Sequence, residues 1–122
     1  MAAPNILSAT SIYGKQTGAA LDTTTTTSLL ANTASSNILL KINSIIVANV
    51  DGSSSADATV SWYNGSTDYH LAKTVTVPAD STLIVMGKDA PIYLEESDKI
   101  AALASAASDL EIVISYEELD DA

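Results

Sequence analysis

The sequence contains no cysteine, no arginine and no phenylalanine among its 122 residues. Without cysteine, neither a disulfide nor a thiolate metal site can hold the fold together. Five lysines stand against 15 acidic residues, for a formal net charge of -10. A nucleic-acid-binding protein needs a cationic face, and the same negative charge opposes binding to an anionic membrane. We therefore expect neither nucleic acid nor a membrane as a partner, whereas a basic protein surface would suit the charge.

Long apolar runs are also missing. No run is long enough to span a bilayer, and no segment has the positive start and continuous apolar stretch of a signal peptide. We therefore expect a soluble protein made in the cytoplasm. Aromatic residues are few, one Trp and five Tyr, so Ile, Leu and Val must build the core. Ile and Val, with the many threonines, are β-branched and favour strands over helices.

What the sequence does contain is a succession of short apolar stretches. In the longest, residues 38–50, the even-numbered positions are mostly apolar, while Ile45 and Val47 interrupt the alternation and suggest a strand covered on both faces. Residues 83–86 are apolar throughout and predict a central strand, and residues 70–77 would point Leu71, Val75 and Val77 inward. Further strands are predicted over 58–63, 92–94, 99–104 and 110–117, with a hairpin or edge strand over 11–22 and, at the threonine run 23–27, an exposed strand or a linker.

Turn residues separate these stretches at about ten-residue intervals, and Asn64-Gly65 is the strongest hairpin signal. About eight strands spaced in this way are typical of an antiparallel β-sandwich or jelly roll. We assign residues 11–118 to this single domain, 1–10 to an extended N-terminal arm and 119–122 to an acidic C-terminal tail. A disordered terminus is the alternative for the arm, which would otherwise order against a neighbouring subunit.

No group of residues predicts catalysis. His70, the only histidine, has no flanking Ser or Cys motif, so we interpret it as a strand residue facing solvent or an interface. Glu95, Glu96 and Asp98 could pair for acid–base chemistry, but their succession predicts a solvated turn. We therefore expect no catalytic residue and no enzyme activity.

A metal site is not predicted either. Alternate residues from Asp51 to Asp57 are Asp or Ser, as at the start of a calcium loop. However, Ala56 and Trp62 stand where an EF-hand loop needs its glycine and its bidentate glutamate, so we predict a turn and no metal or cofactor. The acidic residues within 109–122 are either a solvated tail or a segment that docks onto a basic patch of a partner.

Five stretches follow a known pattern: 41–52 (KINSIIVANVDG), 56–60 (ADATV), 77–83 (VPADSTL), 91–96 (PIYLEE) and 112–118 (IVISYEE). Their succession resembles small virion structural proteins of tailed bacteriophages, in particular marine and cyanobacterial phages. Where that pattern has a glycine–aspartate turn, this chain has Ser97 before Asp98. The resemblance implies a β-sandwich that packs in symmetric copies on a head, neck or tail, and it carries no catalytic residue.

The leading hypothesis is a capsid decoration (cement) protein that binds the outer shell and bridges capsomers. Its partners would be the major capsid protein and other copies of itself, with a trimer as the geometry that the resemblance implies, and its location would be the virion after synthesis in the host cytoplasm. A neck, collar or tail-fibre component is the alternative. A third hypothesis is a carbohydrate-binding module for host recognition, with Trp62, Tyr63 and Tyr69 as its platform.

Overall fold

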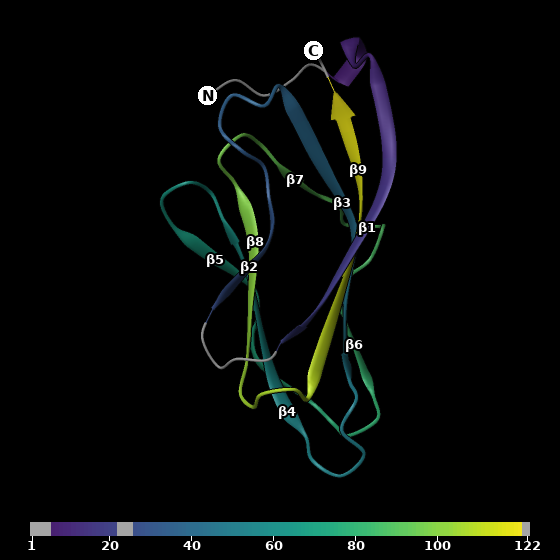
Figure 1. Ribbon diagram of the computed structural model, residues 1–122, viewed down its shortest axis with the longest axis vertical. Helices are drawn as coiled ribbons and strands as arrows, with labels where there is room; N and C mark the ends of the chain where they lie inside the picture. The colour runs from purple at the N-terminus through teal and green to yellow at the C-terminus, as the bar shows by residue number, and fades with distance from the viewer. Residues whose placement is uncertain (1–5, 22–25, 121–122) are drawn as a thin grey trace.

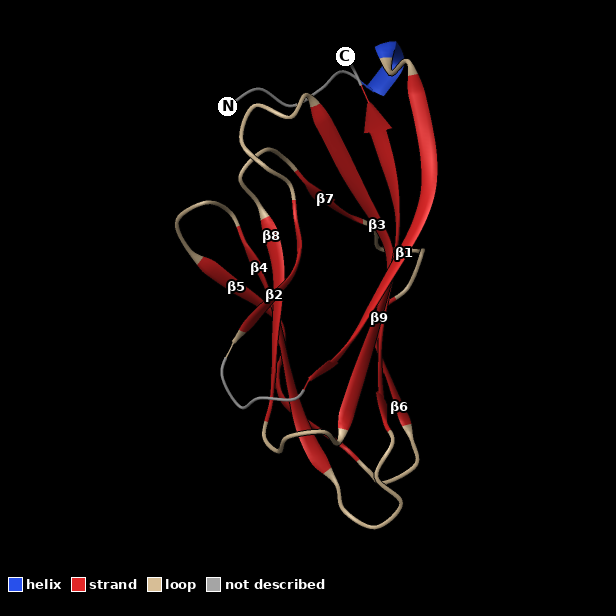
Figure 2. Cartoon of the chain, viewed as in Figure 1, coloured by secondary structure: helices blue, strands red, loops and turns tan. Residues whose placement is uncertain are grey.

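The computed structural model describes residues 6–21 and 26–120, and these residues form two facing layers of strands (Figures 1 and 2). A short 3-10 turn, η1 (Ile6–Ser8), precedes the first strand. The described part of the chain contains nine strands: β1 (Ser11–Leu21), β2 (Thr27–Ala31), β3 (Ile38–Asn49), β4 (Ala56–Tyr63), β5 (Asp68–Val77), β6 (Thr82–Met86), β7 (Ile92–Leu94), β8 (Lys99–Ala104) and β9 (Leu110–Asp120). The predicted all-β sandwich is confirmed.

The strand order is that of a jelly roll. One sheet runs β1-β9-β3-β6, and β7 pairs with the same edge of β3 as β6 does, farther along that strand. The other sheet runs β2-β8-β4-β5. Pairs are nested around the β4–β5 hairpin: β3 pairs with β6 and β7, β2 with β8, and β1 with β9, all antiparallel. A long antiparallel ribbon that rolls up on itself gives this nesting, and the pairs β3–β9 and β4–β8 close the roll.

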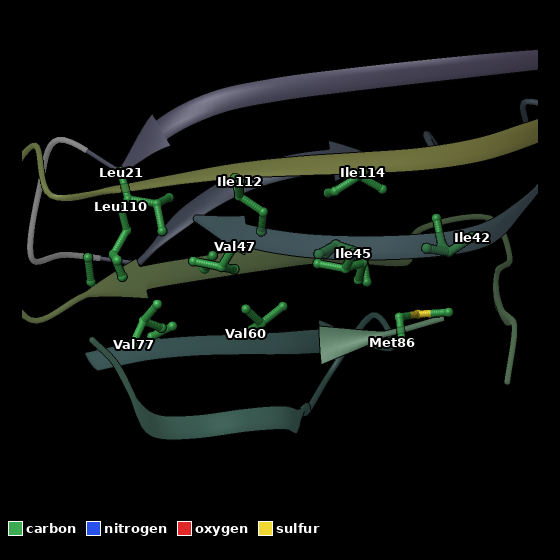
Figure 3. Packing of buried hydrophobic residues seen from close by; sticks show 14 of the residues in the cluster. Leu21, Ile42, Ile45, Val47, Val60, Val77, Met86, Leu110, Ile112 and Ile114 are labelled. Atoms are coloured by element: carbon green, nitrogen blue, oxygen red, sulfur yellow. The ribbon is translucent and has the colours of Figure 1, made fainter. Parts of the chain in front are cut away.

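The core lies between the two sheets, where the side chains that alternate inward from both layers meet (Figure 3). The five-stranded sheet contributes large residues to the core, whereas the four-stranded sheet adds to its Val60, Val77 and Ile100 four small ones, namely Ala56, Ala58, Ala102 and Ala104. Large residues facing small ones fill the space between two sheets without voids. Fully buried large residues include Ile42, Ile45, Val47, Val60, Val77, Leu94, Ile100, Leu110, Ile112 and Ile114.

The irregular pattern of β3 arises from a β-bulge. The register between β3 and β9 shifts between Ile42 and Ser44, so the buried residues change from even to odd numbers, with Ile45 and Val47 both fully buried. The extra residue of the bulge shifts the alternation by one position, so that even-numbered residues face the core before it and odd-numbered residues after it. The prediction that the middle of this strand is covered on both faces is therefore wrong, because Ile46 and Ala48 lie on the outer face.

Several other predicted strands differ in position or extent. Of the two alternatives for residues 11–22, the edge strand is confirmed by β1, whereas β6 is an edge strand and not the predicted central one, with Ile84 66% exposed. Val75 was expected inside but is 36% exposed, since β5 is also an edge. The last strand reaches Asp120, three residues beyond its predicted end. Most of the threonine run and the first five residues of the predicted arm lie outside the described residues.

Two turns match their sequence signals. Gly65 has a φ of 96° in the β4–β5 hairpin, where Asn64 Oδ1 accepts hydrogen bonds from the backbone of Ser66 (3.1 Å) and Thr67 (2.9 Å). Ser97 has a φ of 76°, in the left-handed region that favours glycine. Ser97 therefore holds a backbone conformation that glycine would adopt without strain.

Candidate functional site

Two carboxylates of the acidic turn at residues 95–98 are buried, contrary to the prediction of a solvated turn. Glu96 is 6% exposed and Asp98 is 2% exposed. Oε2 of Glu96 accepts a hydrogen bond from the backbone N–H of Asn37 (2.8 Å), and Oδ2 of Asp98 accepts from the N–H of Glu95 (3.0 Å) and from Nε1 of Trp62 (3.3 Å). Hydrogen bonds from several donors compensate a carboxylate for its loss of water. These carboxylates therefore have structural partners.

Asn32 completes this polar cluster. It is 4% exposed, and its Nδ2 donates to the carbonyls of Ile38 (2.7 Å) and Leu94 (2.9 Å). Its backbone N–H donates to the carbonyl of Asp98, and its own carbonyl accepts from Ser97. The cluster thus fastens the loop before β3 to the turn before β8. The geometry is that of a structural joint, and it does not place two carboxyl groups on either side of a substrate space.

His70 is exposed on β5 and lies in a shallow depression of about 130 Å³ with Ser61 and Asp68. Ser, His and Asp are the residue types of a nucleophilic triad, in which the histidine bridges the other two. Here the hydroxyl of Ser61 donates directly to Oδ1 of Asp68 (3.4 Å). The arrangement is therefore a cross-strand polar contact, and the interpretation of His70 as an exposed strand residue agrees with its position.

The Asp51 loop is a turn closed on its own backbone. Oδ1 of Asp51 accepts hydrogen bonds from the N–H of Ser53 (2.8 Å), the hydroxyl of Ser53 (3.0 Å) and the N–H of Ser54 (3.3 Å), and these bonds lower the pKa of Asp51. Asp57 instead accepts from the hydroxyl of Thr76 on β5 (2.8 Å). The two aspartates therefore serve different contacts, and the described residues contain no group of three or more metal-ligating side chains.

The three aromatic residues of the carbohydrate-binding hypothesis do not share one surface. Trp62 packs against the core and stacks on Tyr69, with ring centroids 5.7 Å apart. Tyr63 points to the opposite side of β4, where the ammonium of Lys99 lies 5.0 Å from its ring centroid. A flat stacking platform for a sugar is therefore not formed by this set.

The acidic residues near the C-terminus belong largely to a central strand. Glu111, Glu117 and Glu118 lie on β9, between β1 and β3. Oε2 of Glu118 forms an ion pair with Nζ of Lys15 (3.1 Å), which raises the pKa of that lysine. Through residue 120 the segment is thus part of a sheet and not a solvated tail.

The most distinctive surface is the outer face of the five-stranded sheet. Cross-strand neighbours share a face, so the register defines it. We call it the A face, and its residues are Gly14, Gln16, Gly18 and Ala20 of β1, Glu111, Val113, Ser115 and Glu117 of β9, Lys41, Asn43, Ser44, Ile46 and Ala48 of β3, Thr82 and Ile84 of β6, and Tyr93 of β7. Sequence reasoning missed this surface, because the bulge in β3 moves Ile46 and Ala48 onto it.

The A face carries little charge and has a hollow on its β1 side. Its only charged members are Lys41, Glu111 and Glu117, in a chain of net charge -10. Near Gly14 and Ser115 the surface forms a depression of about 350 Å³. Large exposed side chains, Ile84 and Tyr93, lie on the opposite edge, at 66% and 40% exposure. Such an arrangement fits contact with another surface better than binding of a small molecule.

No protein-family model matches the chain, and no curated protein matches its sequence. Its fold does recur among solved structures. A chain of Bacillus endospore appendages, a family of disulfide-linked pili, has a TM-score of 0.53 over 91% of this chain and 89% of its own, at 16% identity. A chain of the acidic stable capsid of Helicobacter pylori bacteriophage KHP30 has a TM-score of 0.53 over 93% and 91%, at 9% identity. The chain therefore shares a complete single-domain fold with proteins from a pilus and from a phage capsid.

Proposed function

We propose that the protein is a structural component of a virion and, more specifically, a capsid decoration protein of a tailed bacteriophage. One observation carries the proposal: the whole jelly roll, and not a fragment of it, has its counterpart in a phage capsid chain. The five sequence stretches that resemble small virion proteins of tailed phages support it independently.

The likeness to a pilus subunit suggests a competing function, that of a pilus component. Those appendages are disulfide-linked. This chain has no cysteine, so its residues cannot form that linkage. Assembly of this protein therefore cannot use disulfides between these residues, which favours the capsid over the pilus as the model for its role.

The chemistry of the surface supports a structural role. Glu96, Asp98, Asp51 and Asp57, the carboxylates that the sequence raised as candidates, each accept hydrogen bonds from the protein itself. Turns that join the two sheets carry further acidic groups, namely Asp80 between β5 and β6 and Asp109 between β8 and β9. Negative charge at the ends of the sandwich suits docking on a basic partner surface, which we propose to be the major capsid protein.

Copy number tests the location. Quantitative mass spectrometry of purified virions that contain the protein should give hundreds of copies per particle, because a decoration protein occupies a shell of many symmetry-related sites. About a dozen copies or fewer would instead indicate a neck, collar or tail component. Absence from the particle would contradict the virion role itself.

Deletion of residues 1–10 tests the proposed arm. Thr10 is joined to β9, since its N–H donates to the carbonyl of Asp120 (2.7 Å), but the sheet itself begins at Ser11. We expect the shortened protein to keep its far-UV circular dichroism and to lose binding to shells in co-sedimentation. Unchanged occupancy on shells would rule out the arm as the anchor.

A further inference from the structure

Two glycines in the middle of β1 have no explanation within a single copy. Gly14 and Gly18 both have ordinary extended backbone, since Gly65 is the glycine with positive φ among the described residues. A Cβ at Gly14 would meet nothing within 4 Å, and one at Gly18 would meet ordinary contacts at 3.4 Å and beyond. Glycine weakens a strand, and it often marks a place where another surface approaches closely. Both glycines lie on the A face.

Each glycine begins a row that ends in a large exposed side chain. In the first row, Gly18 pairs with Val113, Val113 with Ile46, and Ile46 with Ile84. The row thus runs from a residue without a side chain on β1 to a projecting side chain on β6, because Ile84 is 66% exposed. Rotating a second copy by 180° about an axis parallel to the strands, between β9 and β3, places its Ile84 over Gly18 and its Ile46 over Val113.

The second row has the same form and adds charge. Gly14 pairs with Glu117, Glu117 with Lys41, and Lys41 with Tyr93. The same rotation places Tyr93 of the second copy over Gly14, and it places Lys41 over Glu117. One two-fold operation therefore sets a projecting side chain over a glycine in both rows and a cation over an anion in the second, which is the self-complementarity that an isologous contact requires.

We propose that the A face is a self-association surface, on which a second copy of this chain packs face to face about a two-fold axis parallel to the strands. Low charge favours this occupant, because two copies of net charge -10 repel each other elsewhere. In the row of Glu111, the rotation sets that glutamate over Ala48 and not over its own equivalent, so no like charges meet. The proposal deepens the proposed function, since it names the face through which copies of the virion protein would contact one another.

The size of the surface sets the expected strength. Four strands and four rows cover about 20 Å by 27 Å, or about 500 Å². Stable interfaces bury about 800 Å² per partner, so this contact is at the small end and the dimer should be weak and dependent on concentration. At the end near the chain termini, Leu39 and Leu119 are already buried within one copy and add nothing to the contact.

Sedimentation velocity of the full chain, from micromolar to millimolar concentration, tests the proposal. The wild type should shift from monomer to dimer. Ile84→Asp should weaken the dimer on the order of 30-fold, because it places a carboxylate against Gly18 of the second copy without a charged partner. Gly18→Leu, whose Cβ meets only ordinary contacts within one copy, should weaken it similarly by occupying the place of Ile84 from the second copy. Val75→Asp is the matched control, since it changes an exposed aliphatic residue on an edge strand of the other sheet.

Each result decides the matter. A dimer that is lost in Ile84→Asp and Gly18→Leu but kept in Val75→Asp supports the A face. A wild-type monomer at millimolar concentration, a trimer, or a dimer that survives both substitutions would overturn the two-fold contact. Because no shells are used, failure here leaves the copy number in virions, and hence the proposed function, to be tested separately.

Discussion

The outer faces of the two sheets come from the same kind of strand, yet their surfaces are organised differently. On the four-stranded sheet, polar side chains engage one another: Ser61 donates to Asp68, Thr76 donates to Asp57, and Lys99 lies over Tyr63. On the A face, glycines and small residues on one edge face aliphatic and aromatic residues on the other. A surface whose polar side chains bond to one another is suited to contact with water. An uneven surface of low charge is instead stabilised when a complementary surface covers it.

The difference also shows how far strand type alone can mislead. Residues 83–86 are apolar throughout, which is typical of a strand buried on both faces, but β6 lies at a sheet edge. The exposure of Ile84 is therefore a property of the single copy. In an assembly that covers the A face, the same residue would be buried, as the sequence predicts.

Adjacent substitutions in β3 should give the largest difference between an inner and an outer position. Ile45 is fully buried and Ile46 is on the A face. Ile45→Ala should lower the free energy of unfolding by about 2–5 kcal/mol because it leaves a cavity. Ile46→Ala should cost about 1 kcal/mol or less. Urea denaturation at a concentration where the protein is monomeric measures both, and the reverse order would show that the bulge is wrongly placed.

Charge reversal at Lys41 should weaken self-association next most strongly. In Lys41→Glu, the new carboxylate would face Glu117 both in its own copy and in the second copy. We expect a dimer on the order of 10-fold weaker, measured by sedimentation. The double variant Lys41→Glu/Glu117→Lys restores opposite charges and should recover the dimer. A double variant as weak as the single one would contradict the proposed pairing.

A substitution on the polar face should have the converse effect. Asp57→Ala removes the acceptor of the Thr76 hydroxyl, so it should lower the free energy of unfolding by about 0.5–1 kcal/mol. Thermal denaturation measures this loss, and sedimentation should show an unchanged dimer. Weakened association would mean that the two faces are not as different as described.

The smallest effect is expected at the end of the A face, where Asp109 precedes β9. Partial desolvation and the nearby Asp51 carboxylate raise the pKa of Asp109. A carboxyl group whose pKa rises on folding disfavours the folded state once both states are ionised, and this effect disappears at pH values below both pKa values. Asp109→Asn should therefore raise the melting temperature slightly at pH 7 and leave it unchanged near pH 3. An equal gain at both pH values would point to another cause.

Much of the fold could be predicted from sequence because its signals are local. Alternation identified β4 and β9, and Asn64-Gly65 identified the hairpin around which the other strand pairs are nested. In the sequence, the bulge in β3 is visible only as an interrupted alternation, which fits either a strand covered on both faces or a bulge. Register across strands distant in the chain decides between them, and single-strand patterns contain no such information.

The candidate surfaces were less predictable. In the sequence, Glu96 and Asp98 look like the acidic residues of any solvated turn. Their burial depends on hydrogen-bond donors from Asn37 and Trp62, which lie far away in the sequence. The A face likewise exists only once four strands are in register.

The absence of cysteine allows one direct measurement of the face-to-face contact. In the variant Gly18→Cys/Ile84→Cys, the two thiols of one copy are three strand spacings apart, about 14 Å. A bis-maleimide too short to span that separation should give a covalent dimer, visible by denaturing electrophoresis. The control Ser28→Cys/His70→Cys places thiols at both ends of a row on the other sheet and should remain monomeric. If the control were cross-linked into a dimer and the A-face variant were not, the face-to-face contact of the A face would be contradicted.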